Sequence, residues 1–202
     1  MLFDFDKDYV LENEMVRLEP LNAAHLSHLS DVAKSPEIWV FFDEGGPGIE
    51  EFQTYHDRAI RNRANHVQYP FVVFDKRARC YAGMTRLYAY DSKLKNIKLG
   101  HTWYGKKFQK TGLNKACKHC ILKFVFESLD VERVGLGVHE ENVQSKRALA
   151  SIGIRKEGEL LNFFYKIESE GRCALILYGV TKQEWKSKLK NKLHGQYKSY
   201  LA

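Results

Sequence analysis

The chain has 202 residues and a formal net charge of +7, from 32 basic and 25 acidic residues. Hydrophobic residues make up 44% and aromatic residues 13%, which excludes an intrinsically disordered chain. No segment reaches the roughly 18 uninterrupted apolar residues of a membrane span, and acids stand at the N-terminus where a secretory signal carries basic residues. Four cysteines are too few for a disulfide scaffold. We therefore expect a cytoplasmic protein without a membrane partner.

The positive charge is concentrated near the C-terminus. Residues 182–202 carry six lysines against Glu184 alone, so the first 181 residues hold only two of the seven net charges. A protein that coats nucleic acid would spread its basic residues over the domain. We expect a single domain over residues 12–182, followed by a basic helix or tail over 183–202. Nucleic acid is not expected as a partner.

Apolar residues recur with the period of strands or of helices along the whole chain. In chain order, strands are expected over residues 15–20, 71–74, 81–88, 97–103, 131–138, 160–165 and 173–180. Helices are expected over residues 23–32, with Asn22 as the cap, and over 49–64, 113–129, 142–152 and 185–193. Short turns between the second, third and fourth strands predict an antiparallel meander. The order of elements predicts a mixed α/β fold, with a mostly antiparallel central sheet of about seven strands flanked by helices.

The most informative segment runs from Gly105 to Asn114, between a strand and a strongly periodic helix. Such a loop presents unpaired N–H groups and the positive end of the helix dipole, and its glycines let the backbone approach a ligand. Six lysines and no acid lie between Gly105 and Phe124: Lys106, Lys107, Lys110, Lys115, Lys118 and Lys123. The segment matches neither a Walker loop nor a dinucleotide fingerprint. It predicts an anion site suited to phosphates that these lysines surround; a plain connection beside a solvated lysine face is the alternative.

These residues resemble a known family. Gln109-Lys110-Thr111-Gly112-Leu113-Asn114 resembles the Gln/Arg-x-x-Gly-x-Gly/Ala acyl-CoA loop of the GNAT superfamily of N-acetyltransferases. Asn at the last position departs from the general pattern and is familiar in the RimJ/RimL-like branch. The segment Asn142-x-x-Ser145-x-x-Ala148-Leu149-x-x-x-Gly153-Ile154 resembles that branch too, which usually has Gly-Phe at its end. The resemblance covers roughly residues 15–185 and implies a GNAT fold whose sheet is splayed between strands 4 and 5.

The resemblance also implies a chemistry. Acetyl-CoA is the expected co-substrate, with no metal, and the acetyl group is expected to pass directly to a primary amine within a ternary complex. The pyrophosphate of CoA would be held by the backbone of Gln109, Lys110, Thr111, Gly112, Leu113 and Asn114. Trp103 and Tyr104, which end one splayed strand, and Asn142 would hold the pantetheine arm. Ser145 matches a residue that donates a proton to the departing thiolate. Asn142 is equally suited to cap a helix.

The general base is left open by the sequence. His139 and Glu140 lie at the end of the other splayed strand, where a base acting through water fits, and a solvated carboxylate is the alternative. Glu141 and His101 are further candidates. Because His101 alternates with Leu99 and Trp103, we expect it to share their face of the sheet and to serve in packing.

The loop over residues 39–46 is expected to line the acceptor pocket, with Phe41, Phe42 and Asp43 as substrate-binding residues. Aromatic rings beside carboxylates suit a cationic amine or a peptide N-terminus, and an exposed acidic loop over an ordinary core is the alternative. The acceptor stays open between a protein N-terminus, a polyamine or amino acid, and an amine-containing antibiotic.

The cysteine pair and the basic tail are two weaker signals. Cys117 and Cys120 have metal-ligand spacing but lie within a helical apolar stripe, and no second pair completes a zinc site, so no metal is expected. The basic tail supports an alternative function, a nucleic-acid- or ribosome-binding protein that keeps a GNAT scaffold. A homodimer is open as an alternative to a monomer.

Overall fold

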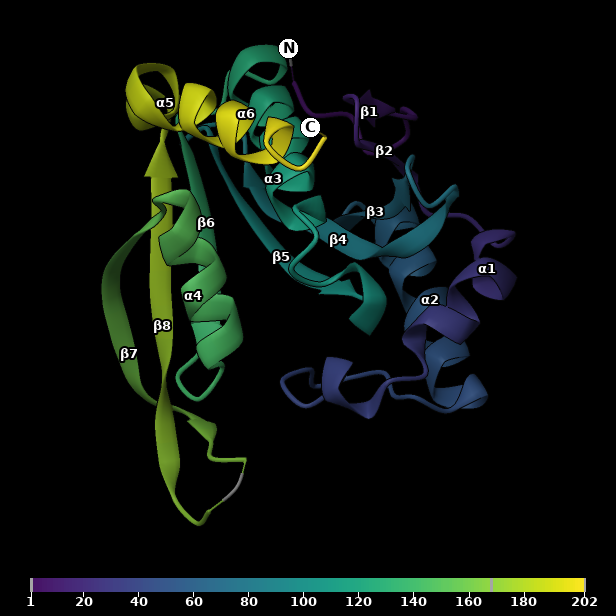
Figure 1. The fold of residues 1–202 in the computed structure, drawn as a ribbon. Helices are drawn as coiled ribbons and strands as arrows, with labels where there is room; N and C mark the ends of the chain where they lie inside the picture. The colour runs from purple at the N-terminus through teal and green to yellow at the C-terminus, as the bar shows by residue number, and fades with distance from the viewer. Residues whose placement is uncertain (1, 168, 202) are drawn as a thin grey trace.

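The computed structural model describes residues 2–167 and 169–201, and an open sheet of eight strands forms its centre (Figure 1). The strands are β1 (Leu11–Glu12), β2 (Val16–Pro20), β3 (Gln68–Asp75), β4 (Cys80–Asp91), β5 (Asn96–Tyr104), β6 (Arg133–His139), β7 (Arg155–Tyr165) and β8 (Arg172–Thr181). Their spatial order is β1-β2-β3-β4-β5-β6-β8-β7. Strands β5 and β6 pair in parallel and the other described neighbours pair antiparallel. The expected mixed sheet is confirmed, with the short β1 as an additional edge strand.

Helices cover both faces of this sheet. They are α1 (His25–Ala33), α2 (Ile49–Ala64), α3 (Leu113–Lys123), α4 (Val143–Ile152), α5 (Lys182–Glu184) and α6 (Lys190–Lys198). Short 3₁₀ turns lie at η1 (Pro36–Ile38) and η2 (Lys106–Phe108), and π-helical turns at η3 (Phe124–Ser128) and η4 (Trp185–Leu189). Within the described ranges no helix has both the length and the apolar character needed to cross a membrane.

The expected start of the first helix is wrong by two residues. The side chain of Asn22 accepts the backbone N–H of Ala24 at 3.0 Å, and the carbonyl of Asn22 accepts the N–H of His25 at 3.1 Å. These bonds close a turn that precedes the helix, so α1 begins at His25. By contrast, α2 begins and ends where the sequence predicts.

Two hydrophobic cores lie on opposite faces of the sheet. One packs under α1 and α2 and the other under α3, α4 and the C-terminal helices. Val72 contributes to the first core, and its neighbours Phe71 and Val73 contribute to the second. Because both faces are covered, the central strands read as continuous apolar runs.

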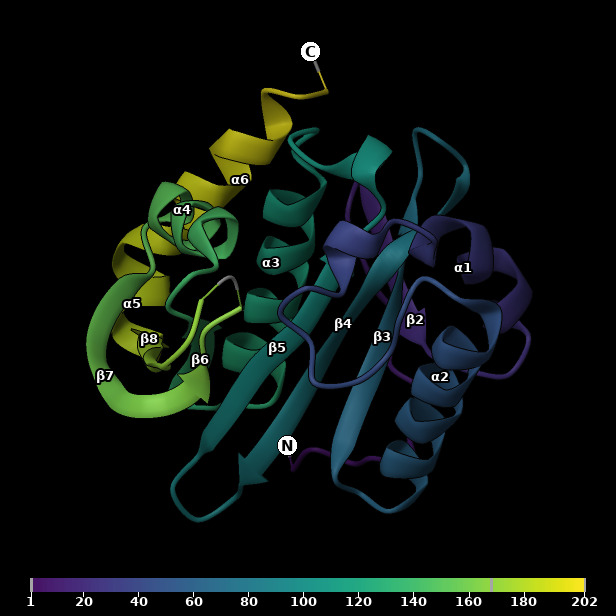
Figure 2. The ribbon, with the colours of Figure 1, turned by 90° about the horizontal axis from the view of Figure 1, so that it is seen from below.

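The lysine-rich C-terminal segment packs against the domain. Trp185, Leu189, Leu193 and Tyr197 are each at most 4% exposed, and their spacing of four residues places them on one side of the helical segment. Helix α6 lies beside α3 (Figures 1 and 2). The segment is therefore part of the hydrophobic core.

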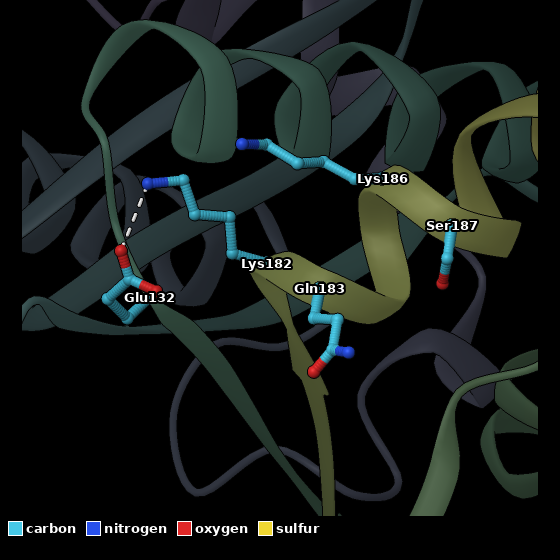
Figure 3. A pocket seen from close by; sticks show the side chains of 5 residues that line it. All are labelled: Glu132, Lys182, Gln183, Lys186 and Ser187. Carbon is cyan, nitrogen blue, oxygen red and sulfur yellow. Dashed lines mark hydrogen bonds and ion pairs between the residues drawn. The ribbon is translucent and has the colours of Figure 1, made fainter.

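Acids of the domain pair with several lysines of this segment. Figure 3 shows its first turn, where a surface pocket is lined by Glu132, Lys182, Gln183, Lys186 and Ser187. Lys182 contacts Glu132 at 3.0 Å and also Asp130. Further along, Lys190 pairs with Glu127 and Lys198 with Glu14. Half of the six lysines are thus neutralised locally.

Candidate active site

Strands β5 and β6 diverge after a short contact (Figure 1). Their pairing joins Asn96–Lys98 to Arg133–Gly135, whereas β5 continues to Tyr104 and β6 to His139. Beyond Lys98, the backbone of β5 therefore has no strand partner on its β6 side. The expected splay between these strands is confirmed.

A β-bulge interrupts the other edge of β5. Pairing with β4 passes from Gly100 to Trp103, so that His101 and Thr102 together oppose one residue of β4. The φ angle of His101 is 47°, in the left-handed region that non-glycine residues rarely adopt. Bulges re-aim side chains beside functional sites.

The bulge overturns the expected position of His101. Leu99 belongs to the core under α3, and Trp103 belongs to the core under α1 and α2. These two residues lie on opposite faces, so His101 cannot share a face with both. The expectation that all three share one face is wrong because the extra residue breaks the alternation of the strand.

His101 lies on the side of the sheet that Phe42, in the loop before α2, covers. Its ring centroid is 5.4 Å from that of Tyr88 and 6.4 Å from that of Phe42. Burial, followed by the charge of Arg86, lowers the pKa of His101 to about 4. The imidazole is therefore neutral at neutral pH and has the capacity to accept a hydrogen bond.

The first turn of α3 has the features of an anion-binding helix start. Gly112 is its N-cap residue with φ 85°, a conformation that favours glycine, and over the described residues no side chain caps the turn. The turn also carries no acid. The backbone N–H groups of this turn therefore have no side-chain partner among the described residues, and with the helix dipole they give this end of α3 a positive potential.

Gln109 ties the loop to its surroundings. Its side-chain amide donates to the carbonyl of Tyr104 at 3.1 Å, and its side-chain oxygen accepts from Gln144 of α4 at 2.9 Å. The loop is closed further by the hydroxyl of Thr111, which donates to the carbonyl of Phe108 at 2.7 Å. These bonds hold the loop between the ends of β5 and α4.

The six lysines of this region do not all surround the loop. Lys106, Lys107 and Lys110 are exposed there, and the Lys115 ammonium lies 5.3 Å from the ring centroid of Tyr200. Lys118 is only 3% exposed and faces the sheet, and Lys123 is the last residue of α3. The expectation that all six line the anion site is therefore wrong for Lys118 and Lys123, because helical periodicity turns them away from the loop.

The side chains of Trp103 and Tyr104 are buried on opposite faces. Trp103 donates its indole N–H to the hydroxyl of Tyr55 at 3.2 Å, and Tyr104 donates its hydroxyl to the side chain of Asn114 at 3.4 Å. What these residues offer a ligand is therefore their backbone on the free edge of β5.

The helix α4 begins beside the splay. The side-chain oxygen of Asn142 accepts the backbone N–H of Ser145 at 2.9 Å, which confirms Asn142 as the N-cap. Its side-chain amide group remains a donor. Ser145 is half-buried in the first turn of the helix.

His139 packs between the two sides of the splay. Its ring lies 5.2 Å from that of Phe41, in the loop before α2, and 4.8 Å from that of Phe164 in β7. Nδ1 accepts the backbone N–H of Glu141 at 3.2 Å, so Nε2 carries the proton and donates to the carbonyl of Tyr165 at 3.1 Å. Both ring nitrogens are thus engaged.

The two neighbouring carboxylates hold backbone groups. Glu140 accepts the N–H of Ala174 at 2.7 Å, and Glu141 accepts the N–H of Ile167 at 2.7 Å. Both carboxylates therefore tie the end of β6 to β8 and to the connection between β7 and β8. Each carboxylate uses one oxygen, Oε2, in this contact.

The fold also brings together three atoms of metal-ligand type that the sequence does not reveal. Ligand atoms of His139, Glu141 and Cys173 lie within 4.8 Å of one another. No sequence spacing marks this group because Cys173 lies on a different strand. The hydrogen bonds that His139 and Glu141 make to backbone groups already account for the geometry of the cluster.

The loop before α2 covers the same region. Phe42 lies 5.5 Å from the ring of Trp39, and Asp43 is exposed. Glu44 pairs with Arg58 at 2.6 Å and with Arg86 at 3.3 Å. Of the two acids in this loop, Asp43 is therefore the one without an arginine partner among the described residues.

Arg86 is a feature that the sequence does not reveal. Its side chain is fully buried, its Nη1 donates to Gln68 at 2.8 Å, and its guanidinium lies 4.3 Å from the ring centroid of Tyr55. The pair with Glu44 and the contact with Tyr55 explain how a charge is held in a core strand.

Known proteins are similar to this chain in both sequence and architecture. The family model "Acetyltransferase (GNAT) domain" matches residues 16–155. A Bacillus subtilis protein named "Putative ribosomal N-acetyltransferase YdaF" is 25% identical over 174 residues, which cover 83% of this chain and 90% of that protein.

Solved structures confirm the fold. A GCN5-related N-acetyltransferase from Brucella melitensis has a TM-score of 0.84 at 24% identity, covering 98% of this chain and 88% of that one. Mycobacterium smegmatis RimJ in complex with CoA-disulfide has a TM-score of 0.74 at 17% identity, covering 93% of each chain. Together with the family match, these likenesses confirm the resemblance to the RimJ/RimL-like branch. The chain belongs to the GNAT family and is an N-acetyltransferase.

Proposed function

We propose that the protein transfers the acetyl group of acetyl-CoA directly to a primary amine within a ternary complex. One observation carries this proposal: the free edge of β5 opens beside the uncapped first turn of α3. An extended ligand with an anionic end fits this pair of features, because the edge offers strand-like pairing and the turn offers N–H groups.

The residues present fit CoA at its pyrophosphate end. Backbone N–H groups over Gln109–Asn114 would bind the pyrophosphate, and the left-handed Gly112 permits the sharp entry into α3. The exposed Lys106, Lys107 and Lys110 would add charge. Bound acetyl-CoA would supply the thioester that the amine attacks.

The pantetheine arm would run along β5. The backbone of Trp103 and Tyr104 would pair with it as an added strand pairs, and the side-chain amide of Asn142 would donate to it from the opposite side. The hydroxyl of Ser145, in the first turn of the same helix, would protonate the departing thiolate. A neutral amine would attack the carbonyl carbon, and the C–S bond would break.

The base that removes the amine proton is proposed to be His139 or Glu140, acting through water. Both groups hold backbone partners, and His139 would have to release the Glu141 N–H from Nδ1 before it accepted a proton there. Direct acceptance is disfavoured for His139, because its Nδ1 lone pair accepts the Glu141 N–H, whereas Glu140 uses one carboxylate oxygen for Ala174 and keeps acceptor capacity on the other.

The acceptor is proposed to be a protein N-terminal amine, with a small-molecule amine as the second choice. The name of the Bacillus subtilis relative supports a ribosomal acceptor. Phe41 and Phe42 would contact its side chains, and the exposed Asp43 would attract its charge before deprotonation.

Calorimetry with acetyl-CoA tests the cofactor site. We expect saturable binding to the wild-type protein and its loss in Gly112→Asp, because the new side chain adds a negative charge to the loop and has to displace the Tyr200 ring at a left-handed position. Gly158→Asp is the matched control, since a Cβ at Gly158 meets no atom within 4 Å. Failure of the wild type to bind at millimolar acetyl-CoA would refute the proposal.

An acceptor panel with thiol release as the readout tests the second substrate. Peptides with free and blocked N-termini, polyamines and aminoglycosides would be compared at equal concentration. A protein-N-terminus acetyltransferase turns over the free peptide and not the blocked one. Turnover of an aminoglycoside alone would replace the proposed acceptor.

The proposed catalytic domain spans residues 12–182, with 183–202 as its C-terminal extension. A homodimer is also proposed, formed along β7, which is an edge strand with exposed apolar residues at Leu161 and Phe163. Sedimentation velocity would decide between monomer and dimer, and Leu161→Lys would dissociate a dimer of this kind.

A further inference from the structure

Lys118 is a buried cation at the centre of the molecule. It lies on the face of α3 that contacts the sheet, and its side chain is 3% exposed. Its ammonium donates to the hydroxyl of Thr102 at 3.0 Å, and that oxygen lies 2.8 Å from the hydroxyl of Thr85. Both threonines are at the bulge of β5 and its partner on β4. The ammonium is thus held against the bulge.

No carboxylate compensates this charge in the described ranges. An ammonium has three N–H donors, and Thr102 is its one hydrogen-bond partner among the described residues. Burial lowers the pKa of Lys118 to about 8. An unpaired charge in a core lowers the free energy of unfolding, so the lysine at this position destabilises the fold.

In the proposed site, the thioester end of bound acetyl-CoA would fall beside this charge. The arm starts at the first turn of α3, just beyond the end of β5, and has to run back along the free edge of that strand. The gap closes at Lys98, where β5 and β6 pair. Between Tyr104 and Lys98, the reacting end therefore meets the bulge at His101 and Thr102.

We propose that Lys118 is a catalytic residue whose ammonium stabilises the negative charge that develops on the CoA sulfur as the thioester breaks. The inference rests on the proposed acetyl-CoA site. The described residues provide no anionic partner for this lysine. The reacting end of the co-substrate would be that partner.

The step balances as follows. The nitrogen of the amine forms a bond to the carbonyl carbon, the C–S bond breaks, and its electron pair passes to sulfur. The ammonium of Lys118 stays protonated and donates a hydrogen bond to the thiolate. Ser145 supplies the proton that converts the thiolate to thiol and regains one from solvent. The proton lost by the amine leaves through the base.

Titration of bound CoA tests the charge without turnover. The ultraviolet absorbance of the thiolate is followed against pH for the protein saturated with CoA, and the same titration with desulfo-CoA is subtracted to remove the protein's cysteines and tyrosines, including the adjacent Cys117 and Tyr104. An opposite charge within contact lowers a pKa by about 1–3 units. We expect the bound thiol to ionise at lower pH in the wild type than in Lys118→Met by a difference of this order.

Kinetics provide the second readout. Lys118→Met should lower kcat by about 10²-fold, the loss typical of one removed transition-state donor, with little change in the KM for acetyl-CoA. Lys118→Arg should recover part of the loss. Lys123→Met, at the exposed end of the same helix, is the matched control and should leave both constants unchanged.

Thr102→Val separates charge from positioning. It removes the hydroxyl that holds the ammonium and leaves the charge, so the low thiol pKa should persist in part. A thiol titration that is identical in wild type and Lys118→Met would overturn the proposal, whatever the change in kcat. Calorimetry of CoA with both proteins distinguishes this failure from failure of the cofactor site itself.

Discussion

The ring of Tyr200 lies on Gly112. A Cβ added to this glycine would come within 2.6 Å of two ring carbons of the tyrosine. The C-terminal segment therefore covers one side of the turn that begins α3. Gly112 is constrained twice, by its left-handed φ of 85° and by this contact.

Gly112→Ala is expected to destabilise the protein by at least about 1–2 kcal/mol, the cost of a left-handed alanine, with a further loss from the clash. Urea unfolding measures the difference. Adding Tyr200→Ala should remove the clash and restore the stability lost to it, while the conformational cost of the left-handed alanine remains. Equal stability of the single and double variants would show that the ring imposes no constraint.

Trp185→Ala is expected to cost about 3–5 kcal/mol, because the indole is fully buried and donates to Glu127 at 2.9 Å. Ser187→Ala, on the exposed side of the same segment, should stay within about 0.5 kcal/mol of wild type. Urea unfolding compares the two. A tail that merely binds RNA would tolerate both changes equally.

Lys118→Met is expected to raise stability at neutral pH. The lysine has a pKa of about 8 in the folded protein and about 10.4 when unfolded. Between these values the unfolded chain binds more protons, so wild-type stability rises as the pH increases through this window. The advantage of the variant should therefore be largest below about pH 8 and shrink towards about pH 10. Unfolding curves at several pH values measure it, and a variant less stable than wild type at neutral pH would indicate a structural lysine.

Asn142→Ala should lose the cap on the Ser145 N–H, at a cost of about 0.5–2 kcal/mol. Asn142→Asp keeps an oxygen that caps the helix and removes the side-chain N–H. It should therefore retain stability and lose affinity for acetyl-CoA. Thermal unfolding and calorimetry together separate the two roles, and unchanged affinity in Asn142→Asp would leave Asn142 as a cap alone.

Local patterns determine much of the fold. The helix α2 begins directly after Gly48 and ends at Ala64, as the sequence pattern predicts. Asp75 and Asp91 begin tight turns because each side chain accepts two backbone N–H groups just ahead of it. The loop over Gln109–Asn114 could be found for the same reason, since glycine and the helix start are adjacent in sequence.

Contacts between distant segments could not be predicted in this way. The bulge at His101 uses a non-glycine residue in a left-handed conformation, so no residue type marks it. The contacts of Lys118 with Thr102 and of Arg86 with Glu44 depend on how helix, loop and sheet meet. The packing of the tail could have been predicted from the apolar residues at every fourth position from Trp185 to Tyr197, but the net charge of the segment was considered instead.

The short contact between β5 and β6 has a mechanical consequence. The sheet consists of two parts that share three residue pairs, so other elements must hold the parts at a fixed separation. Helix α6 does this, because it packs beside α3 on one part and donates from Gln196 to the carbonyl of Ser151 in α4, at 3.0 Å, on the other. The C-terminal helix thus links the two parts and works as a spacer between them.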